Sequence, residues 1–186
     1  MQTKEDYELL INKIDEKANL IIAQMPSNLT KYGKYKYLAK KLCEITDYNY
    51  EYKDSFNEKD YTLVGAFLDK SCVCTGYSYA YKYLCRKVGL FCQTIDAQYE
   101  EGHCWNVIKL NNELYYIDVT WMDSGDITSQ EVFSYDTADI EHQLYLNSEN
   151  NFDDRTIGKA EFIDVKKQFL ETGNIDWTKE KYLLDN

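Results

Sequence analysis

Three side chains in the middle of the sequence have the types and the order needed for an activated thiol nucleophile. Cys74 lies at the expected start of a helix, His103 begins one expected strand, and Asp118 lies within the next. A thiol attacks a carbonyl as the thiolate, and the positive end of a helix together with a nearby imidazole favours that form. His103 would act as general base and then as general acid, while Asp118 would accept a hydrogen bond from its second ring nitrogen. The pattern predicts covalent catalysis.

An attacked carbonyl becomes an oxyanion, which needs hydrogen-bond donors. The backbone N–H of Cys74 would supply one donor, and Tyr61 is the candidate for the second. Trp105 and Trp121 are candidates for the walls of a cleft, although core packing explains each of them equally well. Cys72 lies two residues before Cys74, and the residue types alone leave it open as the nucleophile.

The same residues could instead bind zinc, through Cys72, Cys74, His103 and Cys104. This spacing lacks the usual gap of about two to four residues within each pair of ligands, and adjacent side chains on a strand point to opposite faces. Residues 123–126 are predicted to form a turn rather than a calcium loop, because they lack its ligand spacing. We therefore expect no metal and no cofactor.

The overall composition excludes several other classes of protein. The chain has 186 residues, of which 44% are hydrophobic, and a net charge of −11. It is long enough to bury a core without disulfides, and its charge argues against nucleic acid or an anionic membrane as a partner. No run is long enough to span a bilayer, and the N-terminus has no apolar signal core. We expect a cytoplasmic protein, or a trimmed mature form that is secreted or lies at the cell surface.

Hydrophobic periodicity predicts the elements that must hold these residues. The expected helices cover residues 4–24, 30–46, 61–69 and 74–88, followed by a left-handed cap at Gly89. Residues 54–60 are expected to be a loop, 132–135 a short strand, and 160–172 a terminal helix or a strand followed by one. The tyrosines between Tyr32 and Tyr52 favour a contact between helix and core over a platform for a sugar or nucleobase.

Three strands are expected at residues 90–97, 103–110 and 114–121, the last two joined as a hairpin. If Asn111 and Asn112 form a two-residue turn, His103 faces residue 120, and Asp118 lies on the same face of the sheet, diagonal to His103. A three-residue turn would place the two side chains on opposite faces, because the side-chain period of a strand is two. The triad hypothesis therefore requires an even turn or a bulge.

Four segments of this sequence resemble the bacterial transglutaminase-like superfamily. Cys74-Thr75-Gly76-Tyr77-Ser78 resembles its nucleophile helix, and His103-Cys104-Trp105-Asn106-Val107 resembles its histidine strand. Residues 116–123 resemble its aspartate strand, and residues 61–65 resemble the segment before the cysteine. The resemblance covers about residues 30–123 and selects Cys74 over Cys72, because the Gly-Tyr pair follows Cys74.

The resemblance implies an α+β, papain-like fold with leading helices and a nucleophile helix packed on an antiparallel sheet. It implies one transglutaminase-like domain over residues 1–186, with leading helices at about 4–46, a catalytic core at about 61–123 and a C-terminal extension at 124–186. It also implies a Cys74–His103–Asp118 triad that forms a thioester acyl-enzyme on a protein or peptide substrate. We expect hydrolysis of a peptide or isopeptide bond. The alternatives are acyl transfer from glutamine (cross-linking or deamidation), and a non-catalytic module that binds protein or cell-wall peptide.

Overall fold

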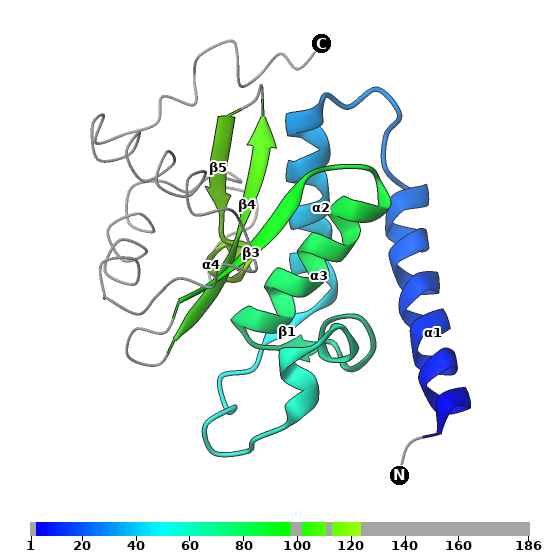
Figure 1. The fold of residues 1–186 in the computed structure, drawn as a ribbon, viewed down its shortest axis with the longest axis vertical. Helices are drawn as coiled ribbons and strands as arrows, with labels where there is room; N and C mark the ends of the chain where they lie inside the picture. The colour runs from blue at the N-terminus through cyan, green and yellow to red at the C-terminus, as the bar shows by residue number, and fades with distance from the viewer. Residues whose placement is uncertain (1–2, 98–101, 111–112, 124–186) are drawn as a thin grey trace.

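The computed structural model describes residues 3–97, 102–110 and 113–123 (Figure 1). Two N-terminal helices, α1 (Lys4–Ala23) and α2 (Lys31–Ile45), begin where the sequence offers a threonine N-cap. The Thr3 side chain accepts a hydrogen bond from the Asp6 N–H in a capping box, and the Thr30 hydroxyl accepts one from Gly33 N–H. Such caps satisfy the first N–H groups of a helix. The two leading helices lie within the predicted ranges.

The segment between α2 and the third helix contains only short elements. Strand β1 (Asp47–Tyr48) pairs in parallel with β2 (Ser71–Cys72), with η1 (Glu58–Tyr61), a 3₁₀ turn, and η2 (Gly65–Asp69), a single π-helical turn, between them. A continuous helix over residues 61–69 was predicted. The chain instead breaks at Thr62, which is extended and caps η1, so that only the later part is helical.

Helix α3 (Cys74–Lys87) is the centre of the fold. Its buried stripe includes Tyr77, Tyr81 and Leu84, each with no exposed surface. Gly89 ends it with φ +75°, and the Leu90 N–H donates to the Cys85 carbonyl oxygen at 2.9 Å. This is the predicted left-handed cap, which glycine adopts without steric strain.

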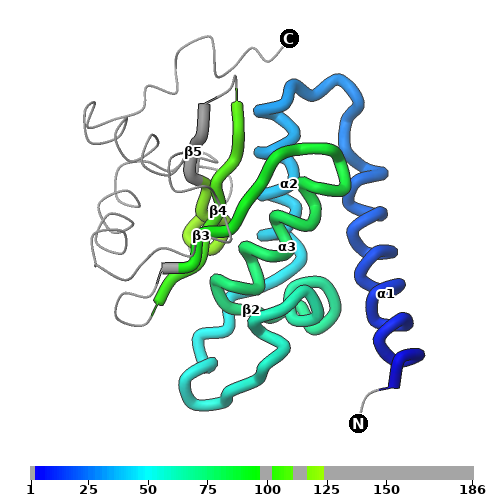
Figure 2. Tube along the Cα trace, viewed as in Figure 1, coloured from blue at the N-terminus to red at the C-terminus, as the bar shows by residue number. Residues whose placement is uncertain are grey.

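Figures 1 and 2 show α2 and α3 between α1 and a three-stranded sheet. The sheet consists of β3 (Cys92–Ala97), β4 (His103–Leu110) and β5 (Glu113–Ile117), antiparallel in the order β3-β4-β5. Helix α3 packs on β3 and β4, and α2 packs on α3. The expected α+β arrangement, a nucleophile helix on an antiparallel sheet, is confirmed.

The pairing of β4 with β5 has the predicted even register. Leu110 pairs with Glu113 and Asn106 with Ile117, which leaves two residues between the strands. The predicted extent of the last strand was wrong: β5 ends at Ile117, and residues Val119–Asp123 form a helical turn, α4. The physical reason is Asp118, whose Oδ1 accepts the Trp121 N–H at 3.1 Å and thereby starts the turn.

The predicted elements at residues 132–135 and 160–172 and the extension at 124–186 lie outside the described residues. Within the described part of the chain, no helix is both long and apolar enough to cross a membrane.

Candidate active site

Cys74 is the first residue of α3, as the sequence predicts. The preceding residue, Val73, is the N-cap, and its apolar side chain makes no capping hydrogen bond. A helix start has four N–H groups without intrahelical partners, and these N–H groups form a natural anion site. The uncapped start of α3 therefore suits an oxyanion that forms next to the Cys74 sulfur. The N–H of Val73 itself donates to the carbonyl oxygen of Asp60 at 3.1 Å, which fixes the chain just before the cysteine.

Gly76 and Tyr77 explain why a Gly-Tyr pair follows the cysteine. A Cβ on Gly76 would lie 2.5 Å from the Asp60 carbonyl oxygen and 2.6 Å from the Cβ of Cys72. Only glycine allows α3 to approach the preceding segment so closely. The Tyr77 hydroxyl lies 3.0 Å from the Thr46 carbonyl oxygen and also contacts the Asp123 carboxylate, so its one O–H is shared between these two acceptors. Tyr77 thus joins the start of α3 to α2 and α4.

The His103 and Asp118 side chains meet in the interior. His103 Nε2–H donates to Asp118 Oδ2 at 2.5 Å, and both residues are buried, at 7% exposure each. Ile117, the last residue of β5, pairs with Asn106 of β4, and Asp118 follows it directly, so that its carboxylate meets His103 at the start of β4. Asp118 has two functions there, because one oxygen caps α4 and the other orients the imidazole. Asp118 therefore holds the imidazole in a fixed orientation.

The Cys74 side chain lies near this pair, close enough to contribute to the raised pKa of the His103 imidazole. Because Nε2 faces Asp118, Nδ1 is the ring nitrogen left for another partner. Burial alone lowers the pKa of His103, but the Asp118 carboxylate and the Cys74 contact raise it and prevail, so the pKa reaches about 10. The site therefore favours an imidazolium at neutral pH, the partner that a thiolate needs. The structure thus places His103 against Asp118, with Cys74 as a neighbour of the imidazole.

Two indole rings lie nearly parallel to the His103 imidazole. The ring centroid of Trp121 is 4.8 Å away at an interplanar angle of 14°, and that of Trp105 is 5.6 Å away at 23°. Trp105 is fully buried, whereas Trp121 is half-buried. Trp105 therefore belongs to the core, and only Trp121 of this pair reaches the surface. Both rings restrict the imidazole, and an aromatic face also favours a cation beside it.

The other cysteines of this region lie in the core. Cys72 has no exposed surface, and burial raises its pKa to about 12. Burial likewise raises the pKa of the Cys104 thiol well above its ordinary value. Only Cys74, of the six cysteines, is not fully buried. Within residues 3–97, 102–110 and 113–123, no three His, Cys, Asp or Glu side chains gather as a metal site would require.

Tyr61 is half-buried, and its ring lies 5.8 Å from that of Phe56. Tyr48, which the sequence did not single out, is the tyrosine that lies near Cys74. Burial raises the pKa of its hydroxyl, and the neighbouring Cys74 raises it further. Tyr48 is there because it pairs with Cys72 in the two-residue β1–β2 ladder. A ladder this short leaves no periodic signal in a sequence.

Asp60 is a second residue that the sequence analysis missed. Its side chain is buried at 2% exposure, where it accepts hydrogen bonds from Asn49 Nδ2 at 2.7 Å and Asn57 Nδ2 at 3.1 Å. The only signal for it in the sequence is the Asn57-x-x-Asp60 spacing, which fits a capped turn.

Comparison with known proteins places this chain in a family. The family model of the transglutaminase-like superfamily matches residues 21–123. This chain belongs to the transglutaminase-like superfamily. Members of this superfamily are cysteine-based acyl transferases and hydrolases, generally with Cys, His and Asp at the active site. No curated protein matches the sequence.

Two solved structures are similar to this transglutaminase-like chain. The crystal structure of a TGase matches with a TM-score of 0.51 and 17% identity, covering 76% of this chain and 38% of that one. Menin, in the structure that reveals its binding site for the Mixed Lineage Leukemia (MLL) protein, matches with a TM-score of 0.47 and 16% identity, over 73% of this chain and 30% of menin. The first likeness concerns the fold alone, and the second is too weak to indicate a shared fold. This chain thus spans well under half the length of the TGase.

Proposed function

We propose that this protein is a cysteine hydrolase that cleaves a peptide or isopeptide bond of a protein substrate through a thioester on Cys74. The observation that carries the proposal is the buried His103–Asp118 pair, with 2.5 Å between Nε2 and Oδ2, beside Cys74 at the start of α3. Membership of a superfamily that acts on protein substrates supports the substrate class. Cys74 is the nucleophile, His103 the acid and base, and Asp118 the orienting carboxylate.

The reaction has two halves. The Cys74 thiolate attacks the amide carbonyl, the first-turn N–H groups of α3 hold the oxyanion, and His103 donates its proton to the nitrogen as the C–N bond breaks. The amine leaves, and the acyl group remains as a thioester. Neutral His103 then removes a proton from water, whose oxygen attacks the thioester carbonyl, and the released thiolate re-forms its ion pair with His103. Asp118 stabilises the imidazolium in both halves.

Water is the default acceptor in this scheme, because it needs no binding site of its own. Transfer to an amine uses the same acyl-enzyme and differs only in the acceptor. The experiment therefore incubates the protein with a mixed peptide library in heavy-oxygen water, with and without methylamine, and analyses the products by mass spectrometry. Hydrolysis places one heavy oxygen in a new carboxylate, whereas transfer yields an N-methylamide.

The matched control is Cys74→Ala, which removes the nucleophile and leaves the buried residues around it in place. We expect heavy-oxygen carboxylates with the wild-type protein and none with the variant. N-methylamide as the dominant product would replace hydrolysis by acyl transfer. If no peptide is converted, yet peptides bind equally well to both proteins, the chain is a non-catalytic binding module and the proposal is wrong.

A further inference from the structure

Residues 47–61 form a lip beside Cys74 whose surface is both aromatic and acidic. At its base, the ring of Tyr48 is stacked on Tyr77 of α3, with 6.5 Å between centroids and 18° between planes. Tyr48 also neighbours Cys74 electrostatically. The rings of Tyr50 and Tyr52 contact that of Tyr48, Tyr61 also lies near it, and Phe56 contacts Tyr61.

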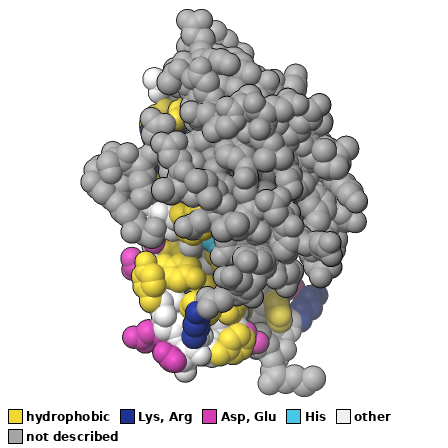
Figure 3. Space-filling view, turned by 90° about the vertical axis from the view of Figure 1, so that its left-hand side faces the viewer, with side chains coloured by type: hydrophobic (Ala, Val, Ile, Leu, Met, Phe, Trp, Pro, Cys, Tyr) yellow, Lys and Arg dark blue, Asp and Glu magenta, His cyan; other side chains and the backbone are white. Residues whose placement is uncertain are grey.

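The outer rings of the lip are exposed to solvent. Tyr50 and Phe56 each have 74% of their surface exposed, more than any other large hydrophobic side chain among the described residues. Figure 3 shows hydrophobic side chains gathered in the lower part of one face of the molecule, with acidic side chains at their edge. Large apolar side chains clustered on a surface are typical of a site that binds another molecule.

Hydrogen bonds hold the lip in one conformation. The buried Asp60 carboxylate binds Asn49 and Asn57, which lie near the two ends of the lip, and the Asp60 carbonyl oxygen accepts the Val73 N–H. The Asn49 N–H in turn donates to the Cys72 carbonyl oxygen at 3.0 Å. The lip is thus tied to the residues on which Cys74 stands, and its position relative to the nucleophile is fixed.

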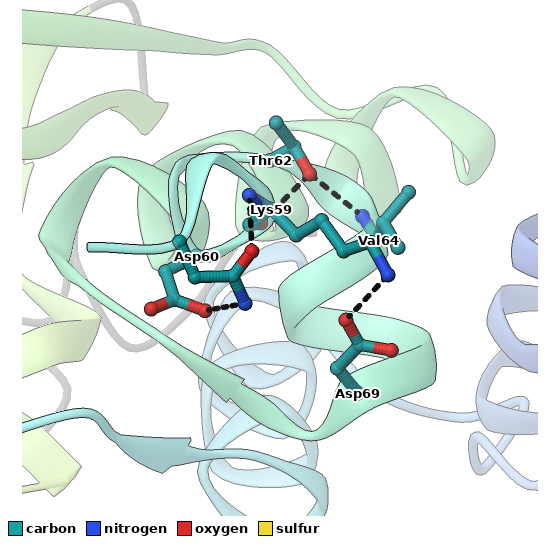
Figure 4. A network of polar contacts seen from close by, with 6 residues as sticks. Lys59, Asp60, Thr62, Val64 and Asp69 are labelled. Atoms are coloured by element: carbon teal, nitrogen blue, oxygen red, sulfur yellow. Dashed lines mark hydrogen bonds and ion pairs between the residues drawn. The ribbon is translucent and has the colours of Figure 1, made fainter. Parts of the chain in front are cut away.

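The charge of the lip is negative. Lys59 is paired with Asp69 at 3.7 Å, outside the lip (Figure 4), and Lys53 lies over the ring of Tyr52, with Nζ 5.7 Å from its centroid. The lip has four exposed carboxylates and only these two lysines, so its net charge is negative. The carboxylates belong to Asp47, Glu51, Asp54 and Glu58. A negative surface beside a catalytic centre attracts cationic substrates and repels anionic ones.

We propose that the lip docks a substrate segment that carries a large apolar side chain and a lysine or arginine close to the reacting amide. The proposal deepens the proposed function and rests on it, because Cys74 defines the reacting position. The apolar side chain packs against Tyr50 and Phe56, and the cation faces the lip carboxylates. A nucleobase would stack on the same rings, but its phosphates would be repelled. A neutral sugar could stack on the rings, but it carries no charge that would pair with the lip carboxylates.

The test measures binding of short fluorescent peptides to the Cys74→Ala protein by anisotropy. The parent peptide contains a phenylalanine and two lysines; in one variant serine replaces the phenylalanine, and in another glutamates replace the lysines. The lip variant is Tyr50→Ser with Phe56→Ser, and the control is Leu9→Ser with Leu20→Ser. Leu9 and Leu20 are exposed at 54% and 52% on α1, away from the lip. All four replaced side chains are exposed, so we expect every variant to fold.

The expected result is that the lip variant binds the parent peptide about tenfold more weakly, whereas the α1 control changes affinity less than about twofold. Replacing the lysines by glutamates should weaken binding about fivefold at low salt, and this difference should shrink at high salt. Equal affinity for all three peptides, or a lip variant that binds like the parent protein, would overturn the proposal. Binding of chitohexaose through Tyr50 and Phe56 with no preference among peptides would also overturn it.

Alkylation of Cys74 in the wild-type protein separates this proposal from the proposed function. A reactive Cys74 with no peptide preference at the lip refutes only the docking proposal. An inert Cys74 with lip-dependent peptide binding refutes hydrolysis, and the lip is then the site of a binding module.

Discussion

Replacing Gly76 by alanine tests whether α3 is held as closely as the site requires. The added Cβ would lie 2.5 Å from the Asp60 carbonyl oxygen and 2.6 Å from Cys72 Cβ, whereas real contacts of this kind stay above 3.0 Å. The start of α3 would have to move by about 0.5 Å against a backbone carbonyl and a buried side chain, in a core that is densely packed. Because Cys74 lies two residues away, the same movement would disturb its contact with His103.

The size of the effect follows from two opposing contributions. Alanine gains about 1 kcal/mol over glycine in a helix interior, while overpacking of this kind costs about 1–3 kcal/mol, and more where backbone atoms must move. We expect a net loss of about 2 kcal/mol in the free energy of unfolding, which corresponds to about 4–8 °C in Tm for a chain of this size. We also expect alkylation of Cys74 to slow by about tenfold.

The assay is urea denaturation of the wild-type protein, Gly76→Ala and Gly33→Ala, together with iodoacetamide labelling of Cys74 in each. Gly33 is the matched control, since it lies in helix α2 and its added Cβ would meet no atom closer than 3.4 Å. Gly33→Ala should leave the protein equally stable or up to about 1 kcal/mol more stable. If Gly76→Ala behaves like Gly33→Ala in both stability and labelling, the close approach is not a requirement of the site.

Three further predictions concern the triad and its neighbours. Asp118→Asn keeps the cap on α4 but removes the charge beside His103, so alkylation of Cys74 at pH 7 should slow by about tenfold or more; an unchanged rate would mean that Asp118 does not support the thiolate. Cys72→Ser should leave both the peptide-cleaving activity and the rate of Cys74 labelling unchanged, because the Cys72 thiol is buried with its pKa raised to about 12; loss of that activity would identify Cys72 as the nucleophile. In a Cys74→Ser background, raising the pH above about 6.5 should destabilise the fold by up to about 1.4 kcal/mol per pH unit until folded His103 loses its proton. The reason is that Asp118 still raises the pKa of folded His103, which therefore keeps a proton that the unfolded chain releases above about pH 6.5. Denaturation at several pH values measures this slope, and adding Asp118→Asn should flatten it; an equal slope in both would assign the effect to other groups.

The core of the site could be predicted from the sequence because each of its parts follows a local rule. The apolar stripe of Tyr77, Tyr81 and Leu84 and the glycine at 89 define α3 and place Cys74 at its start. The two-residue connection between β4 and β5 sets the register that pairs Ile117 with Asn106, and Asp118 follows Ile117 directly. Each of these signals depends only on residues that are close together in the sequence.

The remaining parts depend on tertiary contacts. Val119, Thr120 and Trp121 favour a strand by their β-propensity, but the cap from the Asp118 side chain ends the strand at Ile117. Asp60 lies in a polar segment that predicts an exposed loop, and nothing local indicates that Asn49 and Asn57 bury its carboxylate. The β1–β2 ladder has only two residues in each strand, too few for a periodic pattern.

The most direct test of the account is the pH dependence of iodoacetamide labelling, with each labelled cysteine located by peptide mass spectrometry. The reference is the labelling rate of Cys74 in the same protein unfolded in urea, where it behaves as a free thiol with a pKa of about 8.5. The account predicts that native Cys74 is labelled faster than this reference at pH 6.5 and that His103→Gln abolishes the difference. Native labelling that is no faster than the unfolded reference, or that His103→Gln leaves unchanged, would contradict an activated thiolate at Cys74.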